Sequence, residues 1–286
     1  MVPEDILAVV VSHNGGTKTL RTVEALIGQV GEVLVVDNAS SSDSLELLLS
    51  LRNRVGVSLH LLEANQGIGS ALNHGIRLAR EKGYRWLLTM DQDSLADGAM
   101  IDEFRAALTR NPDWACLTPT LVLHGDYKSG SGRDEEVGCA ITSGNLVRMD
   151  VFEKAGSYDV GMFVDQLDFE FSLRVRKAGF RIHHVANAIL AHELGDVMAP
   201  RGFLGRFHTF HSPLRRYYSF RNYLHLAKRH LRDHPVFVVK LALVHLMLLI
   251  TITIYGRDRA RSFLFIGRGV RDFFRGRVGQ YNEVDR

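Results

Sequence analysis

The 286-residue chain has few cysteines and no strong excess of either charge. Cys116 and Cys139 are its only cysteines, too few for a disulfide framework or a cysteine-ligated zinc site, and they fit a reducing compartment. A net charge of +3 and a hydrophobic content of 46% argue against a disordered chain and against a multi-span membrane protein. The N-terminus also lacks the basic region and apolar core of a secretory signal. We therefore expect a globular cytoplasmic protein.

Short apolar runs without polar alternation recur in the first third of the chain, which is typical of parallel strands buried on both faces. Loops and helical hydrophobic patterns separate these runs. Strands are expected at residues 6–11, 33–36, 58–62 and 84–90, and helices at residues 17–28, 45–51 and 69–82. This alternation predicts right-handed βαβ units and an α/β fold with a doubly wound sheet. Ligands bind such sheets beyond the carboxyl ends of the strands.

The pattern changes after Pro112. Further strands are expected at residues 115–121, 137–142 and 180–185, and helices at residues 151–155 and 165–178. From Arg201 onward the chain is rich in arginine, histidine and aromatic residues, and residues 236–255 are almost uniformly apolar. We therefore expect a catalytic domain over residues 1–200 and a helical, basic and hydrophobic extension over residues 201–286.

Asp91-Gln92-Asp93 follows the fourth expected strand. Two carboxylates spaced i, i+2 at the end of a buried strand suit Mg²⁺ or Mn²⁺ and, through the metal, a phosphate-bearing substrate. Taken alone, such a tripeptide is more often a solvated turn, with Ser94 and Asp97 as turn or cap residues. The other loops at the same sheet edge favour the metal site.

Three other polar or glycine-rich loops should converge on this edge. The carboxylate of Asp37 could accept a hydrogen bond from the imide N–H of a uracil or thymine base, or it could cap the next helix. Residues 65–70 contain two glycines and open a helix, so we expect backbone N–H groups there to face an anion such as a diphosphate. Neither a Walker loop nor a Gly-x-Gly-x-x-Gly fingerprint is present. The loops thus indicate a nucleotide site of another kind.

A second acidic cluster contains Asp165, Asp168 and Glu170. Glu170 and Arg174 are i, i+4 neighbours on the expected helix and should form a structural ion pair. Asp165 and Asp168 would be i, i+3 neighbours on that helix, where mutual repulsion can raise one pKa and prepare a general base. The alternative is that both carboxylates complement the helix dipole.

Together these segments resemble family 2 inverting glycosyltransferases with the GT-A fold. The resemblance covers about residues 6–195 and rests on Val35-Val36-Asp37-Asn38-Ala39-Ser40, Asn65-Gln66-Gly67-x-Gly69-x-Ala71-Leu72-Asn73-x-Gly75, Asp91-Gln92-Asp93, Thr142-Ser143-Gly144-Asn145, Phe163–Glu170, Arg174 and His192. Within that family these motifs resemble those of bacterial rhamnosyltransferases of O-antigen and capsule assembly. This likeness includes the segment His211-Ser212-Pro213-Leu214-Arg215-Arg216-Tyr217-Tyr218.

The resemblance implies an inverting glycosyltransferase, expected to transfer L-rhamnose from dTDP-rhamnose to a cell-surface polysaccharide or a lipid-linked saccharide. It implies that Asp91, Asp93 and His192 bind Mg²⁺ or Mn²⁺. It also implies that Asp168 is the base. Leu167 stands where many relatives have another acid, so Asp165 remains the alternative base, with acceptor positioning as its favoured role. The residues expected to bind the donor are Ser12, Asn14, Asp37, Asn38, Asn65, Gly67, Asn73, Gln92 and Asn145.

The same fold with UDP-galactofuranose or UDP-N-acetylglucosamine as donor is an alternative, and so is a catalytically silent nucleotide-sugar-binding protein. A nucleic-acid partner is not expected, because the basic residues are not interleaved with stacking aromatics on a sheet face.

The apolar run at residues 236–255 is long enough, at ~1.5 Å per residue, to cross a bilayer core of ~30 Å. Lys240 and His245 interrupt the run and basic residues flank it, which favours a helix lying in the membrane interface. A membrane span and an internally packed helix are the alternatives. We expect peripheral association with the inner face of the cell membrane, where the basic tail meets anionic lipid.

Overall fold

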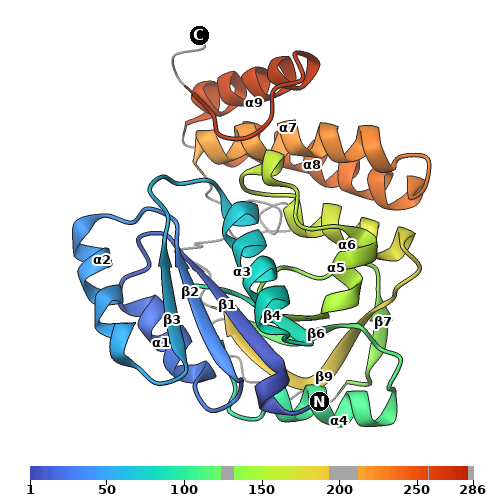
Figure 1. The fold of residues 1–286 in the computed structure, drawn as a ribbon. Coiled ribbons are helices and arrows are strands. Elements are labelled where there is room, and N and C mark those ends of the chain that lie inside the picture. The colour runs from blue at the N-terminus through green and yellow to red at the C-terminus, as the bar shows by residue number, and fades with distance from the viewer. Residues whose placement is uncertain (124–131, 193–211, 257, 283–286) are drawn as a thin grey trace.

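The computed structural model describes residues 1–123, 132–192, 212–256 and 258–282. Its strands form one mixed sheet in the order β3-β2-β1-β4-β8-β6-β9-β5, with β7 paired to β9 (Figure 1). The strands are β1 (Ile6–Ser12), β2 (Glu32–Asp37), β3 (Val57–Leu61), β4 (Trp86–Asp91), β5 (Ser94–Ala96), β6 (Cys116–Leu123), β7 (Glu135–Val137), β8 (Asn145–Arg148) and β9 (Ile182–His192). Strands β1 to β4 run parallel, whereas β8 lies antiparallel to both β4 and β6.

Helices cover both faces of this sheet. The helices of the chain are α1 (Thr17–Leu26), α2 (Ser42–Leu49), α3 (Ile68–Lys82), α4 (Met100–Arg110), α5 (Met149–Ala155), α6 (Leu167–Lys177), α7 (Pro213–His230), α8 (Pro235–Tyr255) and α9 (Arg259–Phe274). One apolar core joins the sheet to α3, α5 and α6, and a second joins its other face to α1 and α4. Because both faces are covered, every residue of β1 is buried, which explains its apolar sequence from Ile6 to Val11.

The C-terminal helices α7, α8 and α9 stack above the edge at which the parallel strands end (Figure 1). Helix α7 begins with Ser212 as its N-cap, whose Oγ accepts a hydrogen bond from the backbone N–H of Arg215. It packs along α9 and also contacts α8. The edge that should bind ligand is therefore covered by residues from the far end of the chain.

The expected early strands and helices are confirmed, with ends that differ by a few residues. The strand expected at residues 137–142 is wrong, because β7 ends at Val137 and the next strand begins at Asn145. Ala140 lies between them and exchanges hydrogen bonds with the Ser172 hydroxyl of α6 rather than with a strand. A helix side chain thus satisfies the backbone of this segment.

The helix expected at residues 165–178 begins later, at Leu167. Asp165 and Gln166 have positive φ angles of 62° and 64°, so both lie in the left-handed region and outside the helix. The premise that Asp165 and Asp168 are neighbours on one helix is therefore wrong. Asp165 belongs to the turn that precedes α6.

Candidate active site

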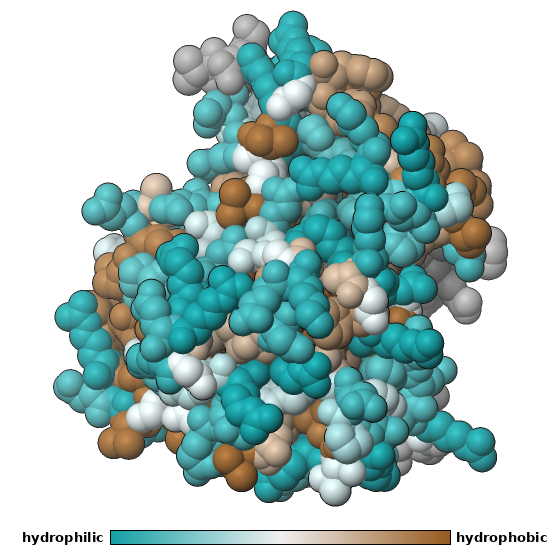
Figure 2. Space-filling view, turned by 45° about the vertical axis from the view of Figure 1, so that its right-hand side comes forward, coloured by the Kyte–Doolittle hydropathy of each residue, from teal (hydrophilic) through white to brown (hydrophobic). Residues whose placement is uncertain are grey.

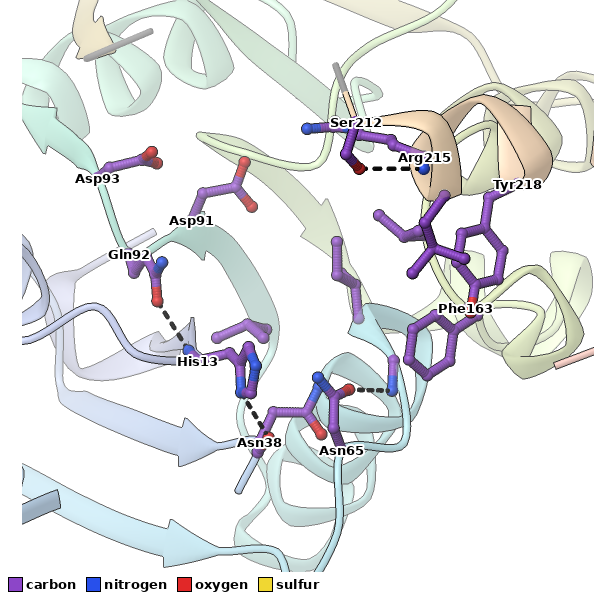
Figure 3. Close-up of a pocket in the computed structure, with 15 residues that line it drawn as sticks. His13, Asn38, Asn65, Asp91, Gln92, Asp93, Phe163, Ser212, Arg215 and Tyr218 are labelled. Atoms are coloured by element: carbon purple, nitrogen blue, oxygen red, sulfur yellow. Dashed lines mark hydrogen bonds between the residues drawn. The ribbon is translucent and has the colours of Figure 1, made fainter. Parts of the chain in front are cut away.

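A pocket of about 530 Å³ opens beyond the carboxyl ends of the parallel strands (Figure 3). Strand ends and the loops after them supply one part of its wall, and the turn before α6 and the start of α7 supply the other. The lining residues are Val11, His13, Asn38, Asn65, Gly67, Ile68, Asp91, Gln92, Asp93, Phe163, Val164, Ser212, Leu214, Arg215 and Tyr218.

Asp91 and Asp93 both line this pocket, with Asp91 as the last residue of β4. Their carboxylates face the same open space, whereas Gln92 between them points toward His13 (Figure 3). Gln92 Oε1 accepts a hydrogen bond of 2.7 Å from the backbone N–H of His13, and its carbonyl accepts one of 2.9 Å from Thr22. Fixing the middle residue in this way positions the two carboxylates on its sides.

The donor set suits a hard divalent cation, because two carboxylates and open pocket space offer oxygen ligands and room for water or phosphate oxygens. Within the part of the chain that the structure describes, no group of three His, Cys, Asp or Glu side chains is arranged to hold a metal. The third expected ligand, His192, ends β9 and pairs through its backbone with Ser94. Its side chain lies outside the described residues. The backbone pairing brings this position beside the residue that follows Asp93.

Asn38 and Asn65 line the pocket, but each also holds a loop in place. Asn38 Oδ1 accepts a hydrogen bond of 2.8 Å from the backbone N–H of Gln66, and Asn65 Oδ1 accepts one of 3.0 Å from that of Gly67. The backbone N–H of Ile68 donates to the carbonyl of Phe163 at 3.0 Å. The expectation that the first N–H groups of α3 are free for a diphosphate is therefore wrong for Gly67 and Ile68.

Gly67 itself faces the pocket with a φ of 83°. A Cβ at this position would lie 2.6 Å from the carbonyl oxygen of Phe163 and 2.8 Å from its Cα. Both the backbone conformation and the close approach of another chain segment require glycine here. Close packing against Phe163, and not ligand access alone, therefore explains why the Asn-Gln-Gly segment has glycine at position 67.

Several residues expected to bind the donor do not line the pocket. Asp37 is only 2% exposed, and its two carboxylate oxygens accept hydrogen bonds from the backbone N–H and the hydroxyl of Ser40. Ser12 is fully buried with its hydroxyl 3.0 Å from that of Thr19. Asn14 is exposed, and its Oδ1 accepts a hydrogen bond from Ser41. The hydrogen bonds of these side chains stabilise the loops beside the pocket.

Asn73 and Asn145 are also not part of the pocket lining. Asn73 forms two 2.9 Å hydrogen bonds with the backbone of Tyr158, which joins α3 to the segment after α5. Asn145 is buried in β8 beside β4, and its Oδ1 has no hydrogen-bond partner among the described residues. The structure places Asn73 in a purely architectural contact.

A second pocket of about 370 Å³ adjoins the first and shares Ile68, Asp91, Val164 and Arg215 with it. Asp165 and Asp168 line this second pocket. Asp91 thus lies on the wall between the two spaces, with Asp93 on one side and Asp168 on the other. Two adjoining spaces with carboxylates at their boundary suit a reaction between two separately bound molecules.

Asp168 has the electrostatic properties of a base. Burial raises its pKa to about 6, and the negative charges of Asp165 and Asp91 act in the same direction. The backbone N–H of Phe169 donates a 2.9 Å hydrogen bond to Oδ1 and opposes the shift. A pKa of about 6 leaves this carboxylate ionised at neutral pH, yet more basic than an ordinary aspartate.

Asp165 differs from Asp168 because it forms an ion pair with an arginine. Arg215 of α7 donates hydrogen bonds of 3.0 to 3.3 Å to both of its carboxylate oxygens. The neighbouring Arg216 also lines the second pocket, where burial lowers its pKa to about 10. The sequence predicted no role for these two arginines. The segment His211–Tyr218, which resembles bacterial rhamnosyltransferases, contains both and was the sequence signal that pointed to them.

The turn that separates the pockets is held by α7. Asn222 Nδ2 donates to the carbonyls of Val164 at 2.7 Å and Asp165 at 3.1 Å, and also to that of Met162. Arg221 is completely buried and donates to the carbonyl of Gly161 at 3.2 Å. The C-terminal helices therefore position the wall of the site.

The expected ion pair between Glu170 and Arg174 is confirmed at 2.8 Å. Burial alone would raise the pKa of Glu170, but hydrogen bonds from His230 and Arg174 outweigh it and lower the pKa to about 2. Since His230 belongs to α7, this buried cluster connects the helix of Asp168 to the C-terminal helices. Its role is structural.

Comparison with known proteins agrees with this architecture. The model of glycosyl transferase family 2 matches residues 7–154. The chain belongs to this family. It is therefore a glycosyltransferase, as expected.

Two curated relatives extend the comparison. The chain is 29% identical over 249 residues to the dTDP-rhamnosyl transferase RfbF of Shigella flexneri, an alignment that covers 79% of this chain and 81% of the relative. It is 26% identical over 183 residues to a poly-beta-1,6-N-acetyl-D-glucosamine synthase of Staphylococcus aureus. That alignment covers 58% of this chain and only 43% of the synthase, so the similarity to the synthase is partial.

Solved structures match at the level of the fold. The structure of GalNAc-T7 with UDP, GalNAc and Mn²⁺ gives a TM-score of 0.61 at 15% identity, covering 78% of this chain and 47% of that chain. S. aureus TarS residues 1–349 with UDP-GlcNAc gives a TM-score of 0.57 at 14% identity, covering 97% of each chain. These matches confirm the α/β GT-A fold with C-terminal helices.

Proposed function

We propose that this glycosyltransferase transfers L-rhamnose, with inversion, from dTDP-L-rhamnose to a hydroxyl of a cell-surface polysaccharide or lipid-linked saccharide. The observation that carries the proposal is the pair of adjoining pockets with Asp91 on their common wall. Similarity to the dTDP-rhamnosyl transferase RfbF across most of both chains supports this donor. We assign the pocket of Asp93 to the donor and that of Asp168 to the acceptor.

In the donor pocket, Asp91 and Asp93 would hold Mg²⁺ or Mn²⁺, with His192 as the third ligand. The bound ion would stabilise negative charge on the departing nucleotide diphosphate. The match to a glycosyltransferase structure with UDP and Mn²⁺ supports a divalent ion of this kind. Asn38 and Asn65 would orient the nucleoside through the loops that they fix.

In the acceptor pocket, Asp168 would accept the proton of the acceptor hydroxyl while that oxygen attacks the anomeric carbon. The new bond forms as the bond from the anomeric carbon to the diphosphate breaks, so one displacement inverts the centre. Asp165, held by Arg215, would bind and orient the acceptor rather than take the proton. This assignment follows from the ion pair, since both carboxylate oxygens of Asp165 already accept hydrogen bonds from Arg215.

The test is transfer followed by NMR, with purified protein, Mn²⁺ or Mg²⁺, dTDP-rhamnose and a defined saccharide acceptor. We expect a new glycosidic signal whose anomeric configuration is opposite to that of the donor. UDP-N-acetylglucosamine is the principal competing donor, because TarS and the poly-N-acetylglucosamine synthase support it. UDP-galactofuranose completes the panel. Binding without transfer to any acceptor would indicate a silent nucleotide-sugar-binding protein.

We further propose that the enzyme works in the cytoplasm at the inner face of the cell membrane. Helix α8 is long and apolar enough to cross a membrane by length and composition, with a mean hydropathy of 2.4, yet only 28% of that stretch is buried. Along the upper right side of Figure 2, where the C-terminal helices lie, apolar side chains are exposed among hydrophilic ones. Vesicle flotation of the full chain, compared with a Leu243→Asp variant, tests this location.

A further inference from the structure

A third pocket, of about 390 Å³, lies between the end of α6 and the start of α8. It has no part in the two pockets of the proposed reaction. Its lining residues are Arg176, Asp233, His234, Pro235, Val236, Phe237 and Lys240. Three of these carry a basic or titratable nitrogen, and the others are mostly apolar.

The pocket has an excess of positive charge. Arg176 and Lys240 are exposed, and neither forms an ion pair with the described part of the chain. The only acid in the lining, Asp233, is paired with Lys177 at 2.6 Å. Two cations without an ion-pair partner among the described residues, beside one acid that is paired with Lys177, favour an anionic ligand.

His234 adds a hydrogen-bonding atom to the same pocket. Its Nε2 is buried and has no hydrogen-bond partner among the described residues. Burial and the neighbouring charge of Arg176 lower the pKa of this imidazole. A negative charge bound between Arg176 and His234 would raise the pKa of the imidazole again. Protonated Nε2 could then donate a hydrogen bond to the bound anion.

The pocket continues into an exposed apolar stripe on α8. Val236, Val239 and Leu243 share a helix face with Lys240, because they are spaced three, four and seven residues apart. These three apolar side chains are 67%, 53% and 54% exposed. Lys240 is the only charged residue between Pro235 and Tyr255. A cationic pocket at one end of an apolar stripe matches an amphiphile with an anionic head and a hydrocarbon tail.

We propose that this pocket binds the phosphate headgroup of an anionic membrane lipid. Arg176 and Lys240 contact the phosphate, and the exposed face of α8 lies among the acyl chains. The proposal rests on the membrane contact proposed above and specifies the site that provides it. The pocket lies at the carboxyl-terminal end of α6, about 12 Å along that helix from Asp168 at ~1.5 Å per residue. A headgroup bound there would leave the reaction site open.

The test compares the full chain with a double variant, Arg176→Gln with Lys240→Gln. Binding is measured by flotation with phosphatidylcholine vesicles that do or do not contain phosphatidylglycerol. We expect the double variant to bind phosphatidylglycerol vesicles more weakly, on the order of tenfold or more, because each basic group near the surface contributes substantially to binding. The control, Arg52→Gln with Arg80→Gln, removes the same charge from exposed positions on other elements. It should bind as the unchanged protein does.

A second arm distinguishes a lipid from free phosphate. Short-chain phosphatidylglycerol below its micelle concentration should shift the His234 imidazole signals in NMR, and the double variant should lose this response. Inorganic phosphate should act more weakly. Equal binding of inorganic phosphate, or unchanged flotation of the double variant, would overturn the proposal. Donor binding and transfer to a soluble acceptor should be normal in both variants, so the outcome is separate from that of the proposed reaction.

Discussion

Arg215 of α7 holds Asp165 of the turn before α6 through a two-pronged ion pair, with Nε and Nη2 at 3.1 and 3.0 Å from Oδ1. The two residues are 50 positions apart in the chain, and Arg215 lines both pockets of the site. The pair therefore forms a side-chain bridge between the turn before α6 and the C-terminal helices at the point where donor and acceptor would meet. It also distinguishes Asp165 from Asp168, which keeps an elevated pKa.

The first prediction concerns the base. Asp168→Asn should lower turnover by about 10²- to 10⁴-fold, because an amide cannot accept the hydroxyl proton. Donor affinity should be nearly unchanged, since Asp168 does not line the donor pocket. Transfer assays and calorimetric titration with the nucleotide sugar measure the two effects. Near-normal transfer by this variant would exclude Asp168 as the base.

The pH dependence follows from the raised pKa of Asp168. Below pH 6 the base is increasingly protonated, so kcat/KM should fall about tenfold per pH unit and should level off above pH 7. The profile of kcat/KM against pH, measured at saturating metal, gives the apparent pKa. A midpoint near pH 4 would mean that the base has the pKa of an ordinary aspartate.

The same shift predicts an effect on stability. Because the folded protein binds this proton more tightly than the unfolded chain does, stability falls as pH rises from about 4 to about 6. Asp168→Asn removes this cost and should raise the free energy of unfolding at pH 8 by about 1–2 kcal/mol, with little change at pH 4. Denaturant unfolding at the two pH values measures the difference. An equal gain at both would point to a cause other than ionisation.

Asp165→Asn should differ from Asp168→Asn. The variant should keep most of its turnover at pH 8, and the midpoint of its pH profile should move down, because the charge of Asp165 raises the pKa of Asp168. The Arg215 left unpaired would act in the same direction. Stability should change by about 1 kcal/mol or less, since the ion pair is partly exposed. A loss of turnover as large as that of Asp168→Asn would instead make Asp165 the base.

The last prediction concerns the close contact between Gly67, at the start of α3, and Phe163. Gly67→Ala should destabilise the fold by about 1–3 kcal/mol more than Gly179→Ala. Both glycines have a positive φ, but only the Cβ at Gly67 would collide with Phe163, whereas open space surrounds Gly179. Thermal unfolding of both variants separates the cost of the collision from the cost of the backbone conformation. Donor affinity should fall only in Gly67→Ala.

Local sequence was sufficient to predict the first half of the sheet. The apolar runs of β1 and β2 have the length and β-branched composition of buried parallel strands, and these properties depend on few distant contacts. It was also sufficient to place Asp91 and Asp93 at the end of β4, because strand end and motif coincide. The Glu170 and Arg174 pair followed from helical spacing alone.

Other features depended on contacts that local patterns do not record. Asp165 looked like a helix residue, but Asn222 and Arg215 hold it in a left-handed turn. The strand expected at residues 137–142 was replaced by hydrogen bonds between Ala140 and Ser172. In both cases the polar groups form hydrogen bonds with side chains that are distant in the sequence, and not with the helix or strand that the local pattern predicted.

The sequence by itself determined the family, the α/β class and the acidic residues that supply the chemistry, because these properties reside in contiguous motifs and their spacing. The tertiary structure decided that Asp168 has a raised pKa and that Asp165 is paired with Arg215. It also decided which of the expected asparagines line the pocket. It also placed α7 over the sheet edge and a cationic pocket beside the exposed face of α8. These depend on burial and on partners far apart in the chain, and only the folded packing brings them together.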